Sequence, residues 1–542
     1  MTTTLLRGGR IHNPVEPHAT CLAITDGVVS WIGPDTGIEQ AGHIDDTVDL
    51  DGLFVAPAFV DAHVHCTDAG LAMVGLDLRS APSLAVALDL LRAHASTGSG
   101  LIWGHGWDEA DWPERRPPTR REIDAAVGSR PTYLTRIDVH SAVVSSAMGD
   151  RLERDRAGYT ADGPLTQDSH HEARRLARAM LSDADRSTAQ RAFLDHAASR
   201  GIVEVHECAF GDPQAVADLA GLLALDTPVA VRAYLGQSVT DPVEAAELLA
   251  RTGAHALGGD LSVDGALGSR TASLLAPYAD SAHGAGHDRG VRYLTDGQIA
   301  DHLVACARAG IQPGFHAIGD DAVAAVAGGL RRAAEILGGT LPLAAVVPRI
   351  EHAEMISAAD IEILSRCGAV ASVQPLFDAL WGGDNGVYVQ RLGAERARPM
   401  NPFAAIAAAG VTLAFGSDAP VTAAEPWAAV RAAVNHRTAG SSVTPRAAFT
   451  AHTRGAHRAA RRMDRGVLTI GATADLAIWR TGELVRPEAT EMARRWSTDP
   501  RSRVPLLPDL GPDAPAPDCV STVSAGRIAY DTGLLVNSSL PR

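Results

Sequence analysis

The chain has 542 residues, of which 46% are hydrophobic and 21% charged, a composition typical of a globular protein. This composition excludes a disordered, collagen-like or coiled-coil protein. Asp and Glu outnumber Lys and Arg by 64 to 48, and the net charge of −16 argues against nucleic acid or an acidic membrane surface as the main partner. All 48 basic residues are Arg, because the sequence contains no Lys.

The N-terminal segment MTTTLLRGGRIHNPVEP lacks the apolar core of a secretion signal. No segment has the roughly 18 consecutive apolar residues of a membrane span. We therefore expect a cytoplasmic protein without a membrane partner. The six cysteines are scattered without a CxxC pair, which indicates neither a disulfide framework nor a zinc finger. A homodimer is expected only because it is the most frequent oligomer.

Short strands separated by turns are predicted at both ends of the chain. Near the N-terminus the segments are TLLRGGRI, CLAITDGVVSWIG and TVDLDGLFVAPA, with Asp26-Gly27 as a hairpin turn. Near the C-terminus, GVLTIGATADLAIW and CVSTVSAGRIAY have the same pattern. We predict that residues 1–56 and about 465–542 form one composite β-sandwich domain.

Between these ends, over residues 57–464, short apolar runs alternate with Ala-rich helical segments. Examples are GIQPGFH before DDAVAAVAGGLRRAAEIL, and VVPRIEH before a helix whose start is marked by Ser357 and Asp360. This alternation, without a Gly-rich dinucleotide fingerprint, predicts an α/β fold of the (β/α)8 TIM-barrel type. Residues from about 80 to 200 fit this pattern poorly, and we predict that they form an insertion that shapes the substrate pocket.

The strongest local signal is the segment FVDAHVH. On a strand, His63 and His65 project to the same side, so both imidazoles can bind one metal ion. His316, His352 and Asp418 each follow an apolar run, and in a barrel the strand ends meet at one face. Either of the later histidines alone could equally be structural, but the joint order favours ligands. Imidazole and carboxylate suit Zn²⁺ or another divalent ion such as Mn²⁺, Fe²⁺ or Co²⁺.

These motifs, together with WGHGWDEADW, RIDVHSAVVSSA, VDGALGSRTA, FHAIGDDAV, RIEHAEM and GSDAP, resemble the amidohydrolase superfamily. More narrowly, they resemble the amidohydrolase-3 group, which includes YtcJ-like proteins and N-substituted formamide deformylases. The resemblance extends from about residue 5 to 535. It implies a (β/α)8 barrel with a flanking β-sandwich, one or two divalent metals, and hydrolysis of an amide-type C–N bond.

One position departs from this group. Many members carry a Lys on the fourth barrel strand, which becomes carboxylated and bridges two metals. Here Asp260 occupies the matching position, and a chain without Lys cannot form that bridge. Asp260 or Glu207 could replace it, although Asp is several bonds shorter than carboxylated Lys. We therefore expect a single ion per chain, most simply Zn²⁺. Its expected ligands are His63, His65, His316 and Asp418, with His352 beside them.

For the reaction, we expect Asp418 to take a proton from the metal-activated water and to pass it to the leaving nitrogen. His352 would support the carbonyl oxygen if it is not itself a ligand. Weaker candidates, each of which could equally be structural, are expected to line the substrate pocket: Trp107, Asp108, His140 and Arg270.

The leading interpretation is a metal-dependent hydrolase of carbon–nitrogen bonds other than peptide bonds, acting on a small amide or formamide. A heterocycle deaminase of the same superfamily is the first alternative. Such deaminases generally place a catalytic Glu at the third residue after the fifth-strand histidine, where this chain has Gly319, which disfavours this alternative. A barrel without metal that serves assembly or regulation is the second alternative, and the presence of all five metal-site residues disfavours it.

Overall fold

The computed structural model of the protein describes residues 2–110, 112–281, 288–485 and 505–542. Two four-stranded sheets form its centre, with strand orders β14-β13-β12-β7 and β15-β16-β17-β18. All pairings inside these two sheets are parallel. Their strands are β7 (Phe59–Val64), β12 (Ile202–Phe210), β13 (Ala230–Gly236), β14 (Ala256–Leu257), β15 (Gly314–Ala317), β16 (Arg349–His352), β17 (Val370–Val373) and β18 (Thr412–Phe415).

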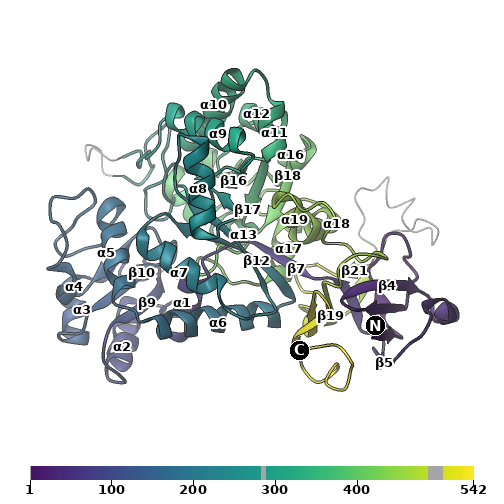
Figure 1. Ribbon diagram of the computed structural model, residues 1–542. Helices are drawn as coiled ribbons and strands as arrows, with labels where there is room; N and C mark the ends of the chain where they lie inside the picture. Colours follow the sequence, from purple (N-terminus) through teal and green to yellow (C-terminus); the bar gives the residue numbers. More distant parts are fainter. Residues whose placement is uncertain (1, 111, 282–287, 486–504) are drawn as a thin grey trace.

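Isolated parallel bridges connect these two sheets at both of their edges. Leu257 at the end of β14 pairs with Pro313 before β15, and Val64 on β7 pairs with Ala419 beyond β18. Helices separate the successive strands, which gives a TIM-barrel-like α/β fold (Figure 1). Because the strands are parallel, their carboxyl ends lie on one side, where residues distant in sequence become neighbours.

Helices surround these strands, and no helix in the described ranges is both long and apolar enough to cross a lipid bilayer. Ser357 accepts a hydrogen bond from the backbone N–H of Asp360, which confirms the predicted helix start there. The helices are α1 (Cys66–Val74), α6 (Asp183–Ser199), α7 (Pro213–Leu223), α8 (Pro242–Thr252), α9 (Asp296–Ala309), α10 (Asp320–Leu337), α11 (Leu341–Val346), α12 (Ala358–Arg366), α13 (Pro375–Trp381), α14 (Val387–Leu392), α15 (Ala394–Ala397), α16 (Phe403–Ala408), α17 (Pro426–Val434), α18 (Pro445–Thr450), the π-helical turn η2 (Ala451–Gly455) and α19 (Ala456–Ala459).

Between α1 and α6 the chain forms a separate sheet with strand order β11-β10-β9-β8, seen on one side of the central strands in Figure 1. The elements of this part are β8 (Leu76–Asp77), α2 (Leu84–Ala95), β9 (Ile102–Trp107), α3 (Arg120–Val127), β10 (Thr132–Arg136), β11 (Ala142–Val144), α4 (Ser146–Gly149) and α5 (Gln167–Ala179). Helix α6, which lies inside the predicted insertion, packs against α1 and leads into β12. It therefore belongs with the helices around the central strands.

The two ends of the chain lie together on the opposite side in Figure 1. One sheet has the order β4-β3-β1-β5, and the other, β2-β6-β19-β22-β23, combines strands from both ends. The turn at Asp26 and Gly27 joins the antiparallel strands β3 and β4, as predicted. The elements are β1 (Thr3–Arg7), β2 (Arg10–Ile11), β3 (Cys21–Thr25), β4 (Val28–Gly33), the 3₁₀ helix η1 (Asp35–Ala41), β5 (Asp46–Asp49), β6 (Phe54–Pro57), β19 (Leu476–Arg480), β22 (Asp518–Ser524) and β23 (Arg527–Asp531), with β20 (Leu484–Val485) paired to β21 (Leu507–Pro508).

A cluster of buried aromatic side chains connects the first central strand to the C-terminal β-structure. Phe59 on β7 makes edge-to-face contacts with Trp427 at 5.1 Å and with Trp479 of β19 at 5.8 Å between ring centroids. Phe449 lies 5.5 Å from Phe59 and stacks on Trp427. Each such pair stabilises the fold by about 0.5–1.5 kcal/mol beyond the burial of apolar area. The cluster therefore fixes β7, the strand that ends at the functional site.

We predict that Phe59→Ala lowers the free energy of unfolding by about 3–5 kcal/mol, because it leaves a cavity among three aromatic rings. Denaturant unfolding measures this loss. Val243→Ala is the matched control, since Val243 is 62% exposed and its truncation should cost less than about 0.5 kcal/mol. Equal stability of the two variants would contradict the structural role of the cluster.

Candidate active site

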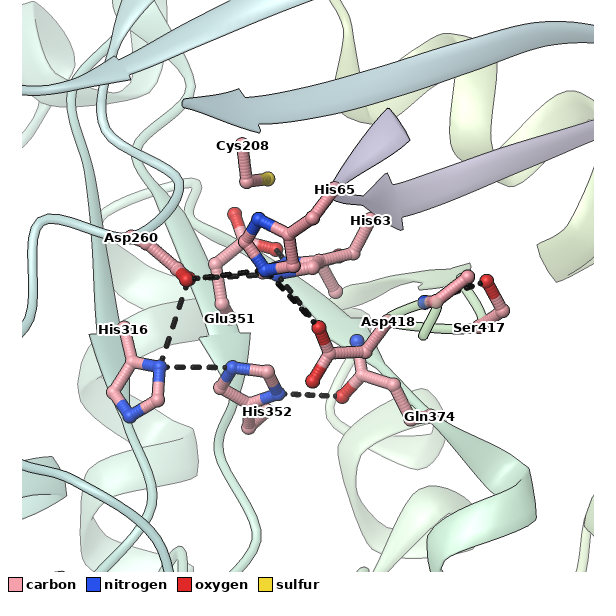
Figure 2. A network of polar contacts seen from close by, with 12 residues as sticks. His63, His65, Cys208, Asp260, His316, Glu351, His352, Gln374, Ser417 and Asp418 are labelled. Carbon is pink, nitrogen blue, oxygen red and sulfur yellow. Dashed lines mark hydrogen bonds and ion pairs between the residues drawn. The ribbon is translucent and has the colours of Figure 1, made fainter. Parts of the chain in front are cut away.

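Four polar side chains meet where β7 and β18 end (Figure 2). His63 Nε2 lies 3.4 Å from Asp260 Oδ1 and 3.5 Å from Asp418 Oδ1. His65 Nε2 lies 3.3 Å from both Asp260 Oδ2 and Asp418 Oδ1. No more than 10% of any of these side chains is exposed. The two histidines of the HxH pair thus face the same pair of carboxylates.

Glu351 fixes the orientation of His63. His63 Nδ1 lies 2.9 Å from Glu351 Oε2, and Arg349 donates from Nε to Glu351 Oε1 at 2.6 Å. Burial alone would raise the pKa of Glu351, but Arg349 and His63 hold it well below its usual value, so the carboxylate is ionised. An ionised carboxylate only accepts, so Nδ1 of His63 carries a hydrogen and Nε2 is left to face Asp260 and Asp418.

The charge balance of this group favours a cation. Burial would lower the pKa of His65, but Asp260 and Asp418 raise it to about 10. Within the described residues, neither His63 Nε2 nor Asp260 Oδ1 has a hydrogen-bond partner. Buried polar atoms without a partner are costly, and imidazole nitrogens beside carboxylate oxygens are the donor set of Zn²⁺ and similar ions. These residues therefore fit a divalent metal.

A second group of possible ligands also contacts Asp260. His316 Nδ1 lies 3.6 Å from Asp260 Oδ1 and 3.0 Å from His352 Nε2. The far nitrogen of each ring meets an oxygen: His316 Nε2 lies 3.3 Å from the carbonyl of Gly265, and His352 Nδ1 lies 2.7 Å from Oε1 of Gln374. These oxygens accept the ring hydrogens, so the two facing nitrogens need a shared proton or a cation between them.

Asp260 therefore contacts both groups despite its short side chain. The backbone brings it inward. A Cβ on Gly258 would lie 2.5 Å from the backbone N of Gly314, and Gly259 has a φ of +64°. Only residues without a side chain allow β14 to approach β15 this closely and then turn toward the site. The two glycines compensate for the short side chain.

Two of these residues have a strained backbone. His352 has a φ of +67° and Asp418 a φ of +55°, in the left-handed region. This conformation costs roughly 1–2 kcal/mol for a residue with a side chain, and such strain concentrates at functional sites. Neighbouring side chains on a strand point to opposite sides, yet Glu351 and His352 both reach the site. The positive φ at the end of β16 explains how.

A cavity of ≈ 470 Å³ opens beside these residues, and its lining includes His316 and Asp418. Its apolar lining consists of Ala266, Leu267, Ile318, Phe377, Trp381, Val387 and Val421. Its other polar lining consists of Asp108, Arg136, Asp138, His140, Glu354 and Tyr388. Arg136 is held by Asp108 at 2.5 Å and by Asp138 at 3.1 Å. The cavity has the mixed, concave lining of a small-molecule site.

Asp108 and His140, two of the predicted pocket residues, line this cavity. Trp107 and Arg270, the other two, do not line this cavity. Trp107 is 1% exposed and packs in a hydrophobic core with side chains of α2, α3 and β10. Arg270 forms an ion pair with Asp280 at 2.6 Å instead of reaching the cavity.

Glu207, predicted as a possible ligand, lies close to His65 but has a different contact. Its Oε2 accepts a hydrogen bond from the backbone N–H of Cys66 at 2.7 Å. Cys66 is the first residue of α1, where a carboxylate is stabilised by the free N–H groups. Glu207 therefore anchors the chain immediately after His65.

Two residues that orient the histidines, Glu351 and Gln374, are not among those predicted from the sequence. Arg349 and Glu351 are charged residues on the same side of β16, and both are completely buried. Two charges at alternate positions of an apolar strand are a signal for a buried ion pair. Gln374 directly follows β17, the position that catalytic groups of such folds occupy.

We predict that Glu351→Gln weakens metal binding by about 10- to 100-fold, because His63 loses the charged partner that orients it. Competition with a chelator measures the affinity. Glu362→Gln is the control, since the Glu362 side chain is 71% exposed and pairs only with Arg366 among the described residues. An unchanged affinity in the Glu351 variant would show that His63 does not depend on this contact.

Comparison with known proteins agrees with this geometry. A family model described as "Amidohydrolase family" matches residues 46–530. The chain is 25% identical over 453 residues to the putative amidohydrolase YtcJ of Bacillus subtilis (strain 168), covering 79% of this chain and 82% of that protein. It is 24% identical over 518 residues to N-substituted formamide deformylase of Arthrobacter pascens, covering 85% and 90%. The crystal structure of an uncharacterized metal-dependent hydrolase from Pyrococcus furiosus superposes with a TM-score of 0.66 and 26% identity, covering 88% of this chain and 98% of that one.

Proposed function

Because the chain belongs to the amidohydrolase family, we propose that it hydrolyses an amide- or formamide-type C–N bond of a small molecule. The observation that carries this proposal is the gathering of four histidines and two aspartates beside a cavity that two of them, His316 and Asp418, line. The resemblance to a formamide deformylase over 85% of the chain supports the bond type. The eight central strands would close a complete barrel around this site, since bridges join both edges of the two sheets.

We propose that His63, His65 and Asp418 hold one divalent ion and that His316 and His352 hold a second, with Asp260 shared between them. This proposal differs from the single ion expected from the sequence, because His316 and His352 face each other beside Asp260. Zn²⁺ is the ion that best suits this donor set. When bound, a divalent ion supplies Lewis acidity and lowers the pKa of a coordinated water.

Asp418 is the proposed proton carrier. Its carboxylate contacts His65 at 3.3 Å and also lines the cavity, so it borders both the ligand group and the substrate. Burial alone would raise the pKa of Asp418, but His63 and His65 lower it, so the carboxylate is ionised at neutral pH. It can accept the proton of the attacking water and then donate that proton to the leaving nitrogen.

His352 is better suited as a ligand than as a group that supports the carbonyl oxygen. Burial and then the positive charge of His316 and His63 lower its pKa to about 4, so the ring is neutral. Gln374 holds Nδ1, and Nε2 faces His316.

Gly319, at the position where related deaminases carry Glu, caps α10 and offers no side chain for proton transfer. A homodimer and a cytoplasmic location remain predictions.

We predict that Asp418→Asn lowers kcat by about 10²- to 10⁴-fold, the usual contribution of a general acid and base. Steady-state kinetics measure the loss, and elemental analysis of the same sample establishes whether metal is retained. Asp384→Asn is the control, because the Asp384 side chain is 77% exposed and pairs with Arg398. Near-native turnover of the Asp418 variant with full metal content would exclude Asp418 as the proton carrier.

The proposed function is tested with a panel of N-substituted formamides and other N-acyl amines. We expect release of the amine, loss of activity with a chelator, recovery with Zn²⁺, and two equivalents of metal per active chain. One equivalent of metal per active chain would instead favour the single-ion site expected from the sequence. Release of ammonia from heterocycles with no amide turnover would favour the deaminase, and a protein with neither metal nor turnover would overturn the enzymatic proposal.

A further inference from the structure

A second cavity, which we call the basic groove, lies at the opposite ends of the same strands. Its lining includes Pro57, which precedes β7, and Val411 and Thr412 at the start of β18. His63 and Asp418 lie where these strands end. Strand β18 alone spans about 13 Å at roughly 3.3 Å per residue. The basic groove is therefore separate from the proposed metal ligands.

Three arginines line the basic groove: Arg446, Arg454 and Arg458. None of its lining residues that the structure describes is acidic. The Nε atoms of Arg454 and Arg458 are buried and have no hydrogen-bond partner in the described part of the chain. Burial lowers the pKa of Arg458, and the positive charge of the neighbouring Arg454 lowers it further.

Two nearby arginines of the same segment, unlike those of the groove, form ion pairs with carboxylates. Arg462 forms an ion pair with Glu204, and Arg465 pairs with Asp475 at 2.9 Å. Arginines with a structural role in this segment thus have carboxylate partners. Among the described residues, the groove arginines have no such carboxylates, and clustered guanidinium groups of this kind have an unfavourable free energy that an anionic ligand would offset.

The backbone around these arginines also departs from regular structure. Helix α18 continues into the π-helical turn η2, which contains Arg454, and then into α19, which contains Arg458. Single π-helical turns occur frequently at functional sites, because they re-aim side chains within a helix. In the same turn, His452 Nδ1 lies 2.9 Å from the carbonyl of Val60 on β7. The arginines are thus carried by a helix that is fixed to the central sheet.

We propose that the basic groove binds a small organic molecule with a phosphate-type oxyanion. Planar guanidinium groups match the oxygen geometry of phosphate, and three of them suit a multiply charged group. The groove has a volume of ≈ 540 Å³, more than inorganic phosphate fills, and Phe449 and Leu413 add apolar lining for an organic part. The net charge of −16 argues against a polyanion such as nucleic acid as the occupant.

The metal-loaded full-length protein is titrated with inorganic pyrophosphate by calorimetry. We expect one pyrophosphate per chain, an affinity that falls with added salt, and a higher thermal unfolding midpoint in its presence. The double variant Arg454→Gln, Arg458→Gln should bind at least about tenfold more weakly, since it loses two charge-assisted contacts. Arg446→Gln, at an exposed position, should lower the affinity by about threefold without risk to folding.

Arg461→Gln is the matched control, because Arg461 carries the same charge on the same segment but does not line the groove. The affinity of the Arg461 variant for pyrophosphate should stay within about twofold of the affinity of the unaltered protein. The proposal is overturned if pyrophosphate does not bind, if the double variant and Arg446→Gln both bind normally, or if Arg461→Gln weakens binding equally. Normal binding in all arginine variants would place pyrophosphate at the metal ligands instead.

Discussion

The site depends on one buried carboxylate that is shared by two groups of histidines. Asp260 contacts His63 and His65 on one side and His316 on the other. Its charge lies among rings that are almost completely buried, where an unbalanced charge is expensive and a cation between the groups is correspondingly favoured. The constraint falls on the backbone, because an Asp reaches this place only if β14 runs unusually close to β15. The fold of one short strand therefore determines where positive charge can bind.

A chain of buried polar contacts extends from the site into the interior of the central strands. His63 is held by Glu351, Glu351 by Arg349, and Arg349 Nη1 lies 2.8 Å from His206 Nδ1. His206 in turn lies 3.3 Å from Glu204. Buried ion pairs of this kind contribute little net stability, but removing one member leaves an unpaired charge that is strongly destabilising. Their benefit here is specificity, because they hold the ring of His63 in one orientation.

Much of this arrangement could be predicted from the sequence, because it depends on short-range rules. Alternation along a strand places His63 and His65 on one side, and the ends of apolar runs identify His316 and Asp418. The remaining features depend on tertiary structure. Asp260 reaches both groups because the backbone comes close to β15 at Gly258 and turns at Gly259. Trp107 packs in a hydrophobic core although the next residue, Asp108, lines the cavity. Local sequence patterns show neither how closely two strands approach nor which way a single side chain packs, so both features are seen only in the three-dimensional structure.

In the proposed centre Asp260 takes the place of a carboxylated Lys, which has a consequence for how the protein matures. A carboxylated Lys is assembled after translation from dissolved carbon dioxide, and its carbamate is lost in acid or when the gas is depleted. Asp260 is encoded directly and needs no such addition. The proposed centre would therefore be completed by metal alone, and its assembly would be independent of the bicarbonate supply in the cell.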